Sequence, residues 1–249
     1  MVSPWYLNFS IATGLQVLLL WRALRARLWS IYPFFYAYVL YASLTSVAFA
    51  LPVVTRHPGY VWVYWWAYFT AAVLRFGVAG EIYRYTFPVD SPLRVRVSVI
   101  TLCAMLFLPF AFWTFMSPSQ GSSPFPDGIR KLALTVMTVI LLILGTARFY
   151  GLGIGRNVWA MATGLLVLMG SDLMDLAAMD LFPRLQVVCG YVHPVAFNFM
   201  LIVWSVGLWR YCPNPSRPIL SRAAAQELVG ICEHQWAQVS NVFRNLVKP

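Results

Sequence analysis

Three charged side chains interrupt long apolar stretches of this sequence and could do chemistry there. Arg75 lies within residues 60–87, and Asp172 and Asp175 lie one helical turn apart within residues 158–181. If these stretches cross a bilayer, each charge costs at least about 2.5 kcal/mol at the midplane and normally faces protein or water with a partner. Arg75 and Asp172 therefore form either a switchable ion pair or proton-linked site, or a structural contact that fixes the register of two helices.

Helix geometry predicts that Arg75 and Asp172 meet. Arg75 is expected near the middle of a helix over residues 60–87, and Asp172 just above the middle of an oppositely directed helix over residues 158–181. At 1.5 Å of rise per residue their depths differ by less than about 10 Å, which a long arginine side chain and helix tilt can close. We therefore predict an ion pair between these two helices.

Further polar and aromatic side chains extend this candidate site toward the outer side. Asp175 shares a helix face with Asp172, and Asn198 lies in the outer half of the last apolar stretch, so the three could line a pocket open to the outside. Trp65 belongs to an aromatic run at the start of residues 60–87, which predicts an interfacial belt or the roof of an apolar ligand pocket. The predicted ligand-binding residues are Arg75, Asp172, Asp175, Asn198 and Trp65.

Two other features predict structural contacts. Glu81 and Arg84 are three residues apart, so they can pair on one helix face near the inner boundary. Gly164, Gly170 and Ser171 are small residues that let another backbone approach closely. We therefore predict an ion pair between Glu81 and Arg84 and the close approach of another backbone at these three small residues.

The inventory of reactive side chains argues against the common membrane enzymes and photoreceptors. The last apolar stretch, residues 194–211, contains no lysine that could carry a retinal Schiff base. Asp172 and Asp175 share one helix, whereas an intramembrane aspartyl protease needs carboxylates on two facing helices. A metal site would need the loop histidines His57 and His193 to converge with a carboxylate. We therefore expect no catalytic residue, no metal and no cofactor, although an enzymatic role stays open.

Composition indicates a membrane protein. The chain has 249 residues, of which 60% are hydrophobic and only 10% are charged, and its mean hydropathy is +0.69. A water-soluble domain of this length would need far more polar surface, whereas about 20 apolar residues suffice for one helical crossing of about 30 Å. The net charge of +10 does not indicate nucleic-acid binding, because the basic residues are confined to loop ends and the tail.

Seven apolar stretches predict an all-α, seven-helix transmembrane bundle over residues 1–212. The predicted helices cover residues 4–22, 32–54, 60–87, 97–116, 132–149, 158–181 and 194–211, with a long polar loop at residues 117–128. A second segment, residues 213–249, begins with a proline-rich elbow. Apolar residues then recur at helical spacing and predict an amphipathic helix that lies on the membrane or packs on a partner.

The charge distribution predicts the orientation of the chain. If the N-terminus is outside, thirteen of the 18 lysines and arginines fall in inner segments, and four fall in outer segments, namely Arg56, Arg130, Lys131 and Arg184. Cytoplasmic loops carry such an excess of positive charge. We therefore predict a multi-pass protein of the cell membrane with an outside N-terminus and a cytoplasmic C-terminus.

Three stretches carry a resemblance that covers the whole chain. They are residues 16–27 (QVLLLWRALRAR), residues 64–67 (YWWA) with their three aromatic side chains, and Arg75-Phe76 followed by Glu81-Ile82-Tyr83-Arg84. In these stretches the chain resembles uncharacterised seven-helix integral proteins of the bacterial inner membrane. The resemblance implies the fold and the location, and it implies no activity.

We therefore expect a non-enzymatic membrane protein that senses or binds something within its outer half and passes the change to its inner face. The alternative is a small transporter or channel subunit in which the intramembrane carboxylates are proton or cation sites. The lipid bilayer is the expected partner in both cases, together with a protein partner or a second copy held through the C-terminal helix.

Overall fold

The computed structural model describes residues 4–51, 59–87, 124–149, 151–181 and 186–212. Within these ranges the chain forms α-helices and one short 3-10 helix, with no β-strand. The elements are α1 (Pro4–Arg25), η1 (Leu28–Ser30), α2 (Pro33–Ala50), α4 (Tyr60–Thr86), α6 (Pro124–Phe149), α7 (Arg156–Leu181) and α8 (Gln186–Gly207). The predicted all-α fold is confirmed for the described residues. The crossing predicted at residues 97–116 and the C-terminal segment 213–249 lie outside them.

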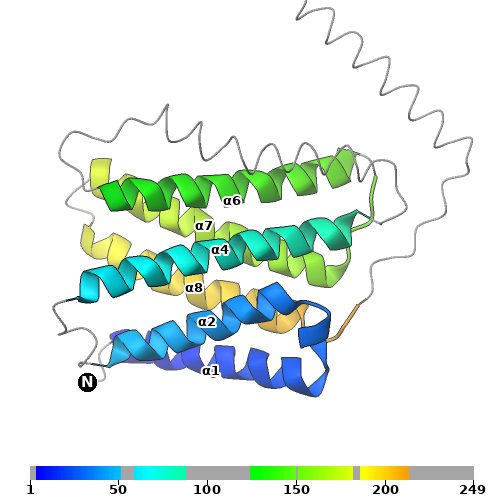
Figure 1. Ribbon diagram of the computed structural model, residues 1–249, viewed down its shortest axis with the longest axis horizontal. Coiled ribbons are helices and arrows are strands. Elements are labelled where there is room, and N and C mark those ends of the chain that lie inside the picture. The colour runs from blue at the N-terminus through cyan, green and yellow to red at the C-terminus, as the bar shows by residue number, and fades with distance from the viewer. Residues whose placement is uncertain (1–3, 52–58, 88–123, 150, 182–185, 213–249) are drawn as a thin grey trace, which may run out of the picture. The chain divides into compact units, whose positions relative to one another are not determined.

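The described helices pack side by side in a bundle (Figure 1). Each helix contacts the next described helix along the chain, α1 packs against α8 to close the ring, and α4 also contacts α7 across it. Helices α1, α4, α6 and α8 end where α2 and α7 begin. We refer to this end as the arginine end, because Arg22, Arg84, Arg148 and Arg156 lie there.

Four helical segments are long and apolar enough to cross a membrane. They are Leu7–Arg25, Pro33–Ala50, Lys131–Phe149 and Arg156–Met174. The apolar segment Val192–Gly207 of α8 is shorter, and α4, whose 27 residues include three charged ones, is not among the four. The four segments support the membrane location that composition predicts.

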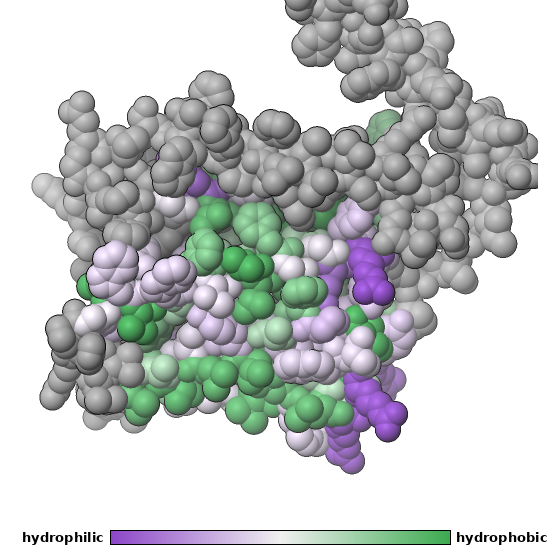
Figure 2. Space-filling model, viewed as in Figure 1, coloured by the Kyte–Doolittle hydropathy of each residue, from purple (hydrophilic) through white to green (hydrophobic). Residues whose placement is uncertain are grey.

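Large apolar side chains are exposed on the surface of the bundle that faces away from its core. Val17, Leu24, Leu44, Val73 and Phe199 are examples from α1, α2, α4 and α8 that are exposed, and Figure 2 shows apolar side chains continuing along this surface. A water-soluble monomer rarely exposes so large an apolar surface. Lipid tails would cover it in a membrane.

Two predicted helix starts are wrong, and both errors concern prolines. Helix α6 begins at Pro124 and not at residue 132, so residues 124–128 of the predicted loop are helical. Helix α8 begins at Gln186 and not at residue 194, with Pro194 inside it. Proline fits the first turn of a helix, where an N–H has no partner to lose. An internal proline removes one backbone hydrogen bond of its helix. In a bundle this loss is tolerated, because neighbouring helices pack around the freed backbone group.

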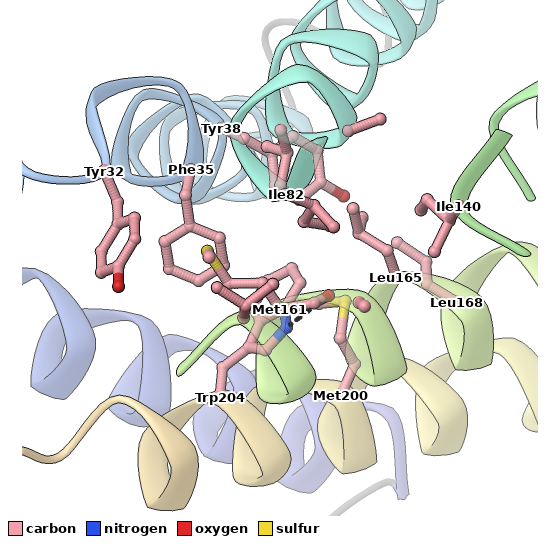
Figure 3. Packing of buried hydrophobic residues seen from close by; sticks show 14 of the residues in the cluster. Tyr32, Phe35, Tyr38, Ile82, Ile140, Met161, Leu165, Leu168, Met200 and Trp204 are labelled. Carbon is pink, nitrogen blue, oxygen red and sulfur yellow. Dashed lines mark hydrogen bonds between the residues drawn. The ribbon is translucent and has the colours of Figure 1, made fainter. Parts of the chain in front are cut away.

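Trp204 joins three helices in the core. Its fully buried indole lies edge-on to the rings of Phe35 and Tyr38 of α2, with centroid distances of 4.7 and 6.0 Å. Its Nε1 donates a hydrogen bond to the Met161 carbonyl of α7 at 3.4 Å (Figure 3). The buried indole N–H therefore has a partner, and α2, α7 and α8 share one packing centre.

A glycine on α7 makes room for this indole. A Cβ atom built at Gly164 would overlap the Trp204 ring, whereas one built at Gly170 would meet no atom within 4 Å. The close neighbour at Gly164 is therefore a side chain and not the backbone that the sequence predicted, and Gly170 has no neighbour within this distance.

Gly164→Ala should lower the melting temperature of the purified protein in detergent, whereas Gly170→Ala should leave it unchanged or raise it. Alanine is about 1 kcal/mol better than glycine within a helix, but overpacking against Trp204 costs about 1–3 kcal/mol. The two variants carry the same chemical change on the same helix, so each controls for the other. Equal melting temperatures would show that Trp204 does not pack on Gly164.

Candidate functional site

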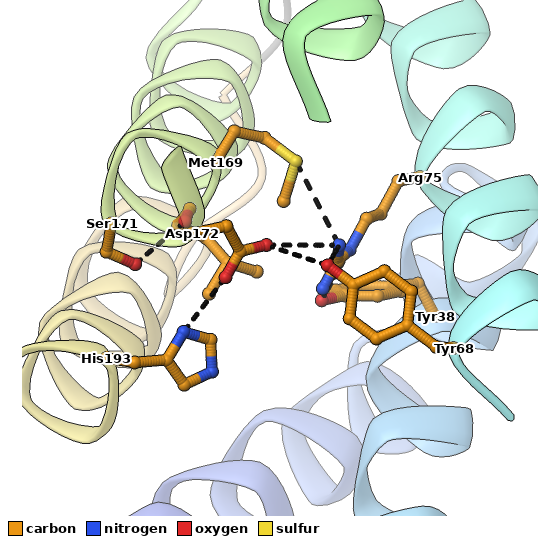
Figure 4. Close-up of polar contacts among 8 residues, drawn as sticks. Tyr38, Tyr68, Arg75, Met169, Ser171, Asp172 and His193 are labelled. Carbon is orange, nitrogen blue, oxygen red and sulfur yellow. Dashed lines mark hydrogen bonds and ion pairs between the residues drawn. The ribbon is translucent and has the colours of Figure 1, made fainter. Parts of the chain in front are cut away.

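Arg75 and Asp172 form a buried ion pair across the bundle (Figure 4). Arg75 Nη1 of α4 lies 3.5 Å from Asp172 Oδ2 of α7, and the two side chains are only 9% and 6% exposed. The predicted contact between these helices is therefore confirmed. The pair forms because α4 and α7, which are not neighbours along the chain, pack directly against each other.

Two tyrosines complete the surroundings of the guanidinium group. Arg75 Nε donates to the Tyr38 hydroxyl of α2 at 3.3 Å, and Nη1 donates to the Tyr68 hydroxyl of α4 at 3.5 Å. The guanidinium carbon also lies 5.6 and 5.4 Å from the centroids of the same two rings, within the range of a cation–π interaction. The charge of Arg75 is thus compensated by a carboxylate, two phenol oxygens and two ring faces.

Tyr68 also reaches the carboxylate. Its hydroxyl donates to Asp172 Oδ2 at 3.2 Å while accepting from Arg75. Met169, one turn before Asp172 on α7, places its sulfur 4.0 Å from Arg75 Nη1. One oxygen of Asp172 is therefore held by two donors from α4.

The other carboxylate oxygen of Asp172 contacts His193. His193 Nδ1 of α8 lies 2.9 Å from Asp172 Oδ1, and the imidazole is 43% exposed, whereas the carboxylate is 6% exposed. Histidine was predicted to lie in a loop here, which is wrong because α8 begins before it. An exposed imidazole is thereby connected through one buried carboxylate to a buried guanidinium, from α8 through α7 to α4.

The remaining predicted ligand-binding residues do not join this cluster among the described contacts. Asn198 Nδ2 donates to Asn8 Oδ1 of α1 at 3.4 Å, so its amide is directed away from Asp172. Trp65 is half-buried and packs edge-on to Tyr64, with 5.3 Å between ring centroids. The side chain of Asp175 lies outside the described residues. The pocket predicted from Asp172, Asp175 and Asn198 is therefore not supported at Asn198.

Glu81 binds a helix end, and the predicted ion pair with Arg84 is wrong. Glu81 Oε1 and Oε2 accept hydrogen bonds from the backbone N–H groups of Phe34 and Phe35, at 2.8 and 2.9 Å. These N–H groups lie in the first turn of α2, which begins at Pro33. The exposed Arg84 guanidinium instead lies 6.0 Å from the Tyr85 ring.

The helix end is the better partner for a buried carboxylate. The first N–H groups of a helix have no partner within it and form the positive end of its dipole, whereas an exposed ion pair contributes only about 0–1 kcal/mol. Tyr32, which precedes Pro33, is buried against the Tyr85 ring at 5.0 Å. Burial raises the pKa of the Tyr32 phenol above its ordinary value, so this neighbour of the carboxylate stays neutral.

Sequence reasoning missed Tyr38, Tyr68 and His193. Tyr68 precedes Arg75 by seven residues, or two helical turns, so its place on the same face was readable from spacing. His193 was hidden by the misplaced start of α8. No sequence signal marks Tyr38, because its contact with Arg75 joins two different helices.

Comparison with known proteins adds no further constraint. No protein-family model, no curated protein and no solved structure matches this chain. Within the described part of the chain, no three histidine, cysteine, aspartate or glutamate residues are grouped so that they could hold a metal ion. The helical fold of the described residues and the four segments that are long and apolar enough to cross a membrane indicate a helical membrane protein.

Arg75→Ala and Asp172→Ala should each destabilise the protein strongly, by about 3–5 kcal/mol for a broken buried pair. The double variant should recover part of the loss, because each single variant leaves an uncompensated buried charge. Thermal unfolding in detergent measures all three. Combining Arg84→Ala with Asp172→Ala is the control and should give additive losses. Additive losses for Arg75 and Asp172 would mean that the two side chains do not interact.

Glu81→Ala should destabilise the protein by about 2 kcal/mol or more, because two buried N–H groups of α2 lose their acceptor. Arg84→Ala should change the stability by no more than about 0.5 kcal/mol, as expected for an exposed side chain. Denaturant unfolding of the two variants makes the comparison. Similar losses for both would restore the Glu81–Arg84 ion pair as the explanation.

Proposed function

We propose that this chain is a non-enzymatic, multi-pass membrane protein that senses or binds a stimulus at the Arg75–Asp172–His193 cluster and couples it to the rest of the bundle. One observation carries the proposal: a single buried carboxylate, Asp172, is shared between a guanidinium of α4 and an imidazole of α8. A change in one contact necessarily alters the other. The cluster can therefore link the positions of α4 and α8, which both contact α7.

A proton is the simplest input for this arrangement. Histidine is the side chain that changes charge near neutral pH, and His193 is the exposed member of the cluster. A protonated imidazole attracts Asp172 more strongly and competes with Arg75 for it. The groups that face this carboxylate are Arg75 and Tyr68 of α4 and His193 of α8, with Tyr38 of α2 behind Arg75.

A ligand near His193 could act in the same way, provided that it binds one arrangement of the cluster better than the other. Only such a difference in affinity shifts a population of conformations. The output would pass along α4, whose other end holds α2 through Glu81. Helix α4 therefore connects the cluster, through Arg75, with the arginine end, through Glu81.

The proposal includes seven crossings, an outside N-terminus and a cytoplasmic C-terminus, in a cell membrane of the bacterial inner-membrane kind. The positive charge gathered at the arginine end supports this orientation. Helix α4 ends at that end and α6 begins at the opposite one, which supports a further crossing between them. Residues 213–249 would add a helix that binds the membrane, a protein partner or a second copy.

A small transporter or channel subunit is the second candidate. The contact between His193 and Asp172 favours it, because an exposed imidazole beside a buried carboxylate can pass a proton inward, as relay residues do in pumps and transporters. In this case the carboxylate would be a proton or cation site. The two candidates differ in whether a solute crosses the membrane.

The sensing proposal predicts that α4 and α8 move relative to each other when pH changes. The distance between α4 and α8 is measured by pulsed electron paramagnetic resonance between spin labels at Val73→Cys and Phe199→Cys, which are both exposed positions. The four native cysteines are replaced by serine in this protein. Between pH 8 and pH 5.5 we expect a shift of about 1–2 Å, typical of helix shifts. His193→Gln should abolish the shift.

Labels at Val17→Cys and Leu44→Cys, which are exposed on α1 and α2, form the control pair and should show no shift. An unchanged α4–α8 distance in the otherwise native protein would argue against sensing by this cluster. Proton flux into liposomes measures the alternative. Flux that depends on the protein and disappears in Asp172→Asn would favour the transporter.

A further inference from the structure

Two arginines hold the C-terminal end of α8 at the arginine end of the bundle. Arg22 Nε of α1 donates to the Trp209 carbonyl at 2.8 Å, and Arg156 Nη2 of α7 donates to the Val206 carbonyl at 2.9 Å. Val206 is in the last turn of α8, and Trp209 follows it by three residues, just after the helix ends at Gly207, so the two arginines contact carbonyls of one short stretch of chain. Arg25, one turn after Arg22, is exposed beside them.

Buried Asn157 completes this helix end. Its Nδ2 donates to the Arg210 carbonyl at 3.3 Å, and its Oδ1 accepts from the Cys212 N–H at 2.9 Å. Val206 is among the final residues of α8, whose carbonyls have no partner within the helix. Trp209 and Arg210 follow the helix end at Gly207, and three side chains from α1 and α7 donate to the carbonyls of this stretch. The guanidinium groups are thereby fixed in position before any ligand arrives.

The positive charge at this end has no acidic counterpart among the described residues. None of the ion pairs in the described part of the chain includes an arginine of this end. Glu81 is the described carboxylate nearest to it, and it is buried against the N–H groups of α2. Each of Arg22 and Arg156 uses one nitrogen for a carbonyl contact, and a guanidinium group has five N–H donors.

Aromatic side chains indicate that this end lies at the depth of lipid headgroups. Trp21, Trp159, Trp209 and Tyr211 are all exposed there, and such rings favour the membrane–water interface. The guanidinium carbon of Arg22 lies 5.6 Å from the Trp209 ring, and that of Arg25 lies 5.3 Å from the Trp21 ring. Figure 2 shows strongly hydrophilic residues at this end next to the exposed apolar side chains.

We propose that Arg22, Arg25 and Arg156 bind the phosphate of an anionic phospholipid at the junction of α1, α7 and α8. The planar guanidinium fork matches phosphate oxygens with two parallel hydrogen bonds. Leu24 of α1 with Ile202 and Val206 of α8 are exposed beside the arginines and would contact the acyl chains. Basic sites between helices at a cytoplasmic membrane surface bind such headgroups.

Two features favour an anionic lipid over other sources of phosphate. A zwitterionic lipid carries its own positive group, which would meet the uncompensated arginines. A free phosphate ion would gain nothing from the apolar side chains next to the site. The bound lipid would contact both α1 and α8, the two helices whose contact closes the ring.

Native mass spectrometry of the full chain from nanodiscs of equal phosphatidylglycerol and phosphatidylcholine tests the proposal. The unmodified protein should retain phosphatidylglycerol preferentially. Arg22→Gln/Arg25→Gln/Arg156→Gln should reduce the bound phosphatidylglycerol at least about fivefold, because it removes the charge-assisted hydrogen bonds to the phosphate. The matched control is Arg27→Gln/Arg84→Gln/Arg148→Gln, which removes the same charge from exposed arginines of the same end.

The control should change lipid retention less than about twofold, because exposed arginines outside the site act on the lipid only through attraction that salt screens. Equal loss in both triple variants would mean diffuse attraction without a site, and equal retention of both lipids by the unmodified protein would also overturn the proposal. Inorganic phosphate that displaces the lipid at equal concentration would assign the site to free phosphate. If the first triple variant does not fold, the single variants Arg25→Gln and Arg27→Gln are compared instead. Equal retention of phosphatidylglycerol by these two variants would contradict the proposed lipid site.

Discussion

A guanidinium charge in an apolar helix bundle is the constraint on which the centre of this structure depends. Arg75 cannot be deprotonated at ordinary pH, so its surroundings must compensate the charge. Asp172 supplies the opposite charge, and Tyr38 and Tyr68 supply oxygen acceptors and ring faces. These partners come from three helices, and the contact between α4 and α7 crosses the ring of helices. The ion pair therefore fixes which helices meet as well as where they meet.

The same rule governs the ends of helices at the arginine end. The first N–H groups of α2 are bound by Glu81 of α4, and carbonyls at and just after the end of α8 are bound by Arg22, Arg156 and Asn157. Side chains from other helices thus contact both helix ends, and the charges of Glu81, Arg22 and Arg156 oppose the helix dipoles. The sequence places the charges of Glu81, Arg22 and Arg156 near the ends of apolar stretches. In the structure these side chains make contacts between helices.

The central cluster and the arginine end have different chemical characters. At the centre, one carboxylate is shared by two positively chargeable groups, so its contacts can be redistributed within the bundle. At the arginine end the positive groups outnumber the described carboxylates, so their compensation must come from outside the described bundle. The first arrangement suits a response inside the protein, and the second suits contact with the membrane surface.

Sequence alone determined the fold class, the membrane character, most helix positions and the pairing of Arg75 with Asp172, because hydropathy and the cost of a buried charge are local or depend only on depth. It failed at Pro124 and Pro194, since whether a proline starts a helix or lies within one depends on neighbouring helices. It failed also at Glu81, whose neighbour Arg84 was visible while the distant helix end at Phe34 was not. His193 and Tyr38 joined the site only through packing. Tertiary structure decided these contacts because the rotation of each helix about its axis is set by its neighbours.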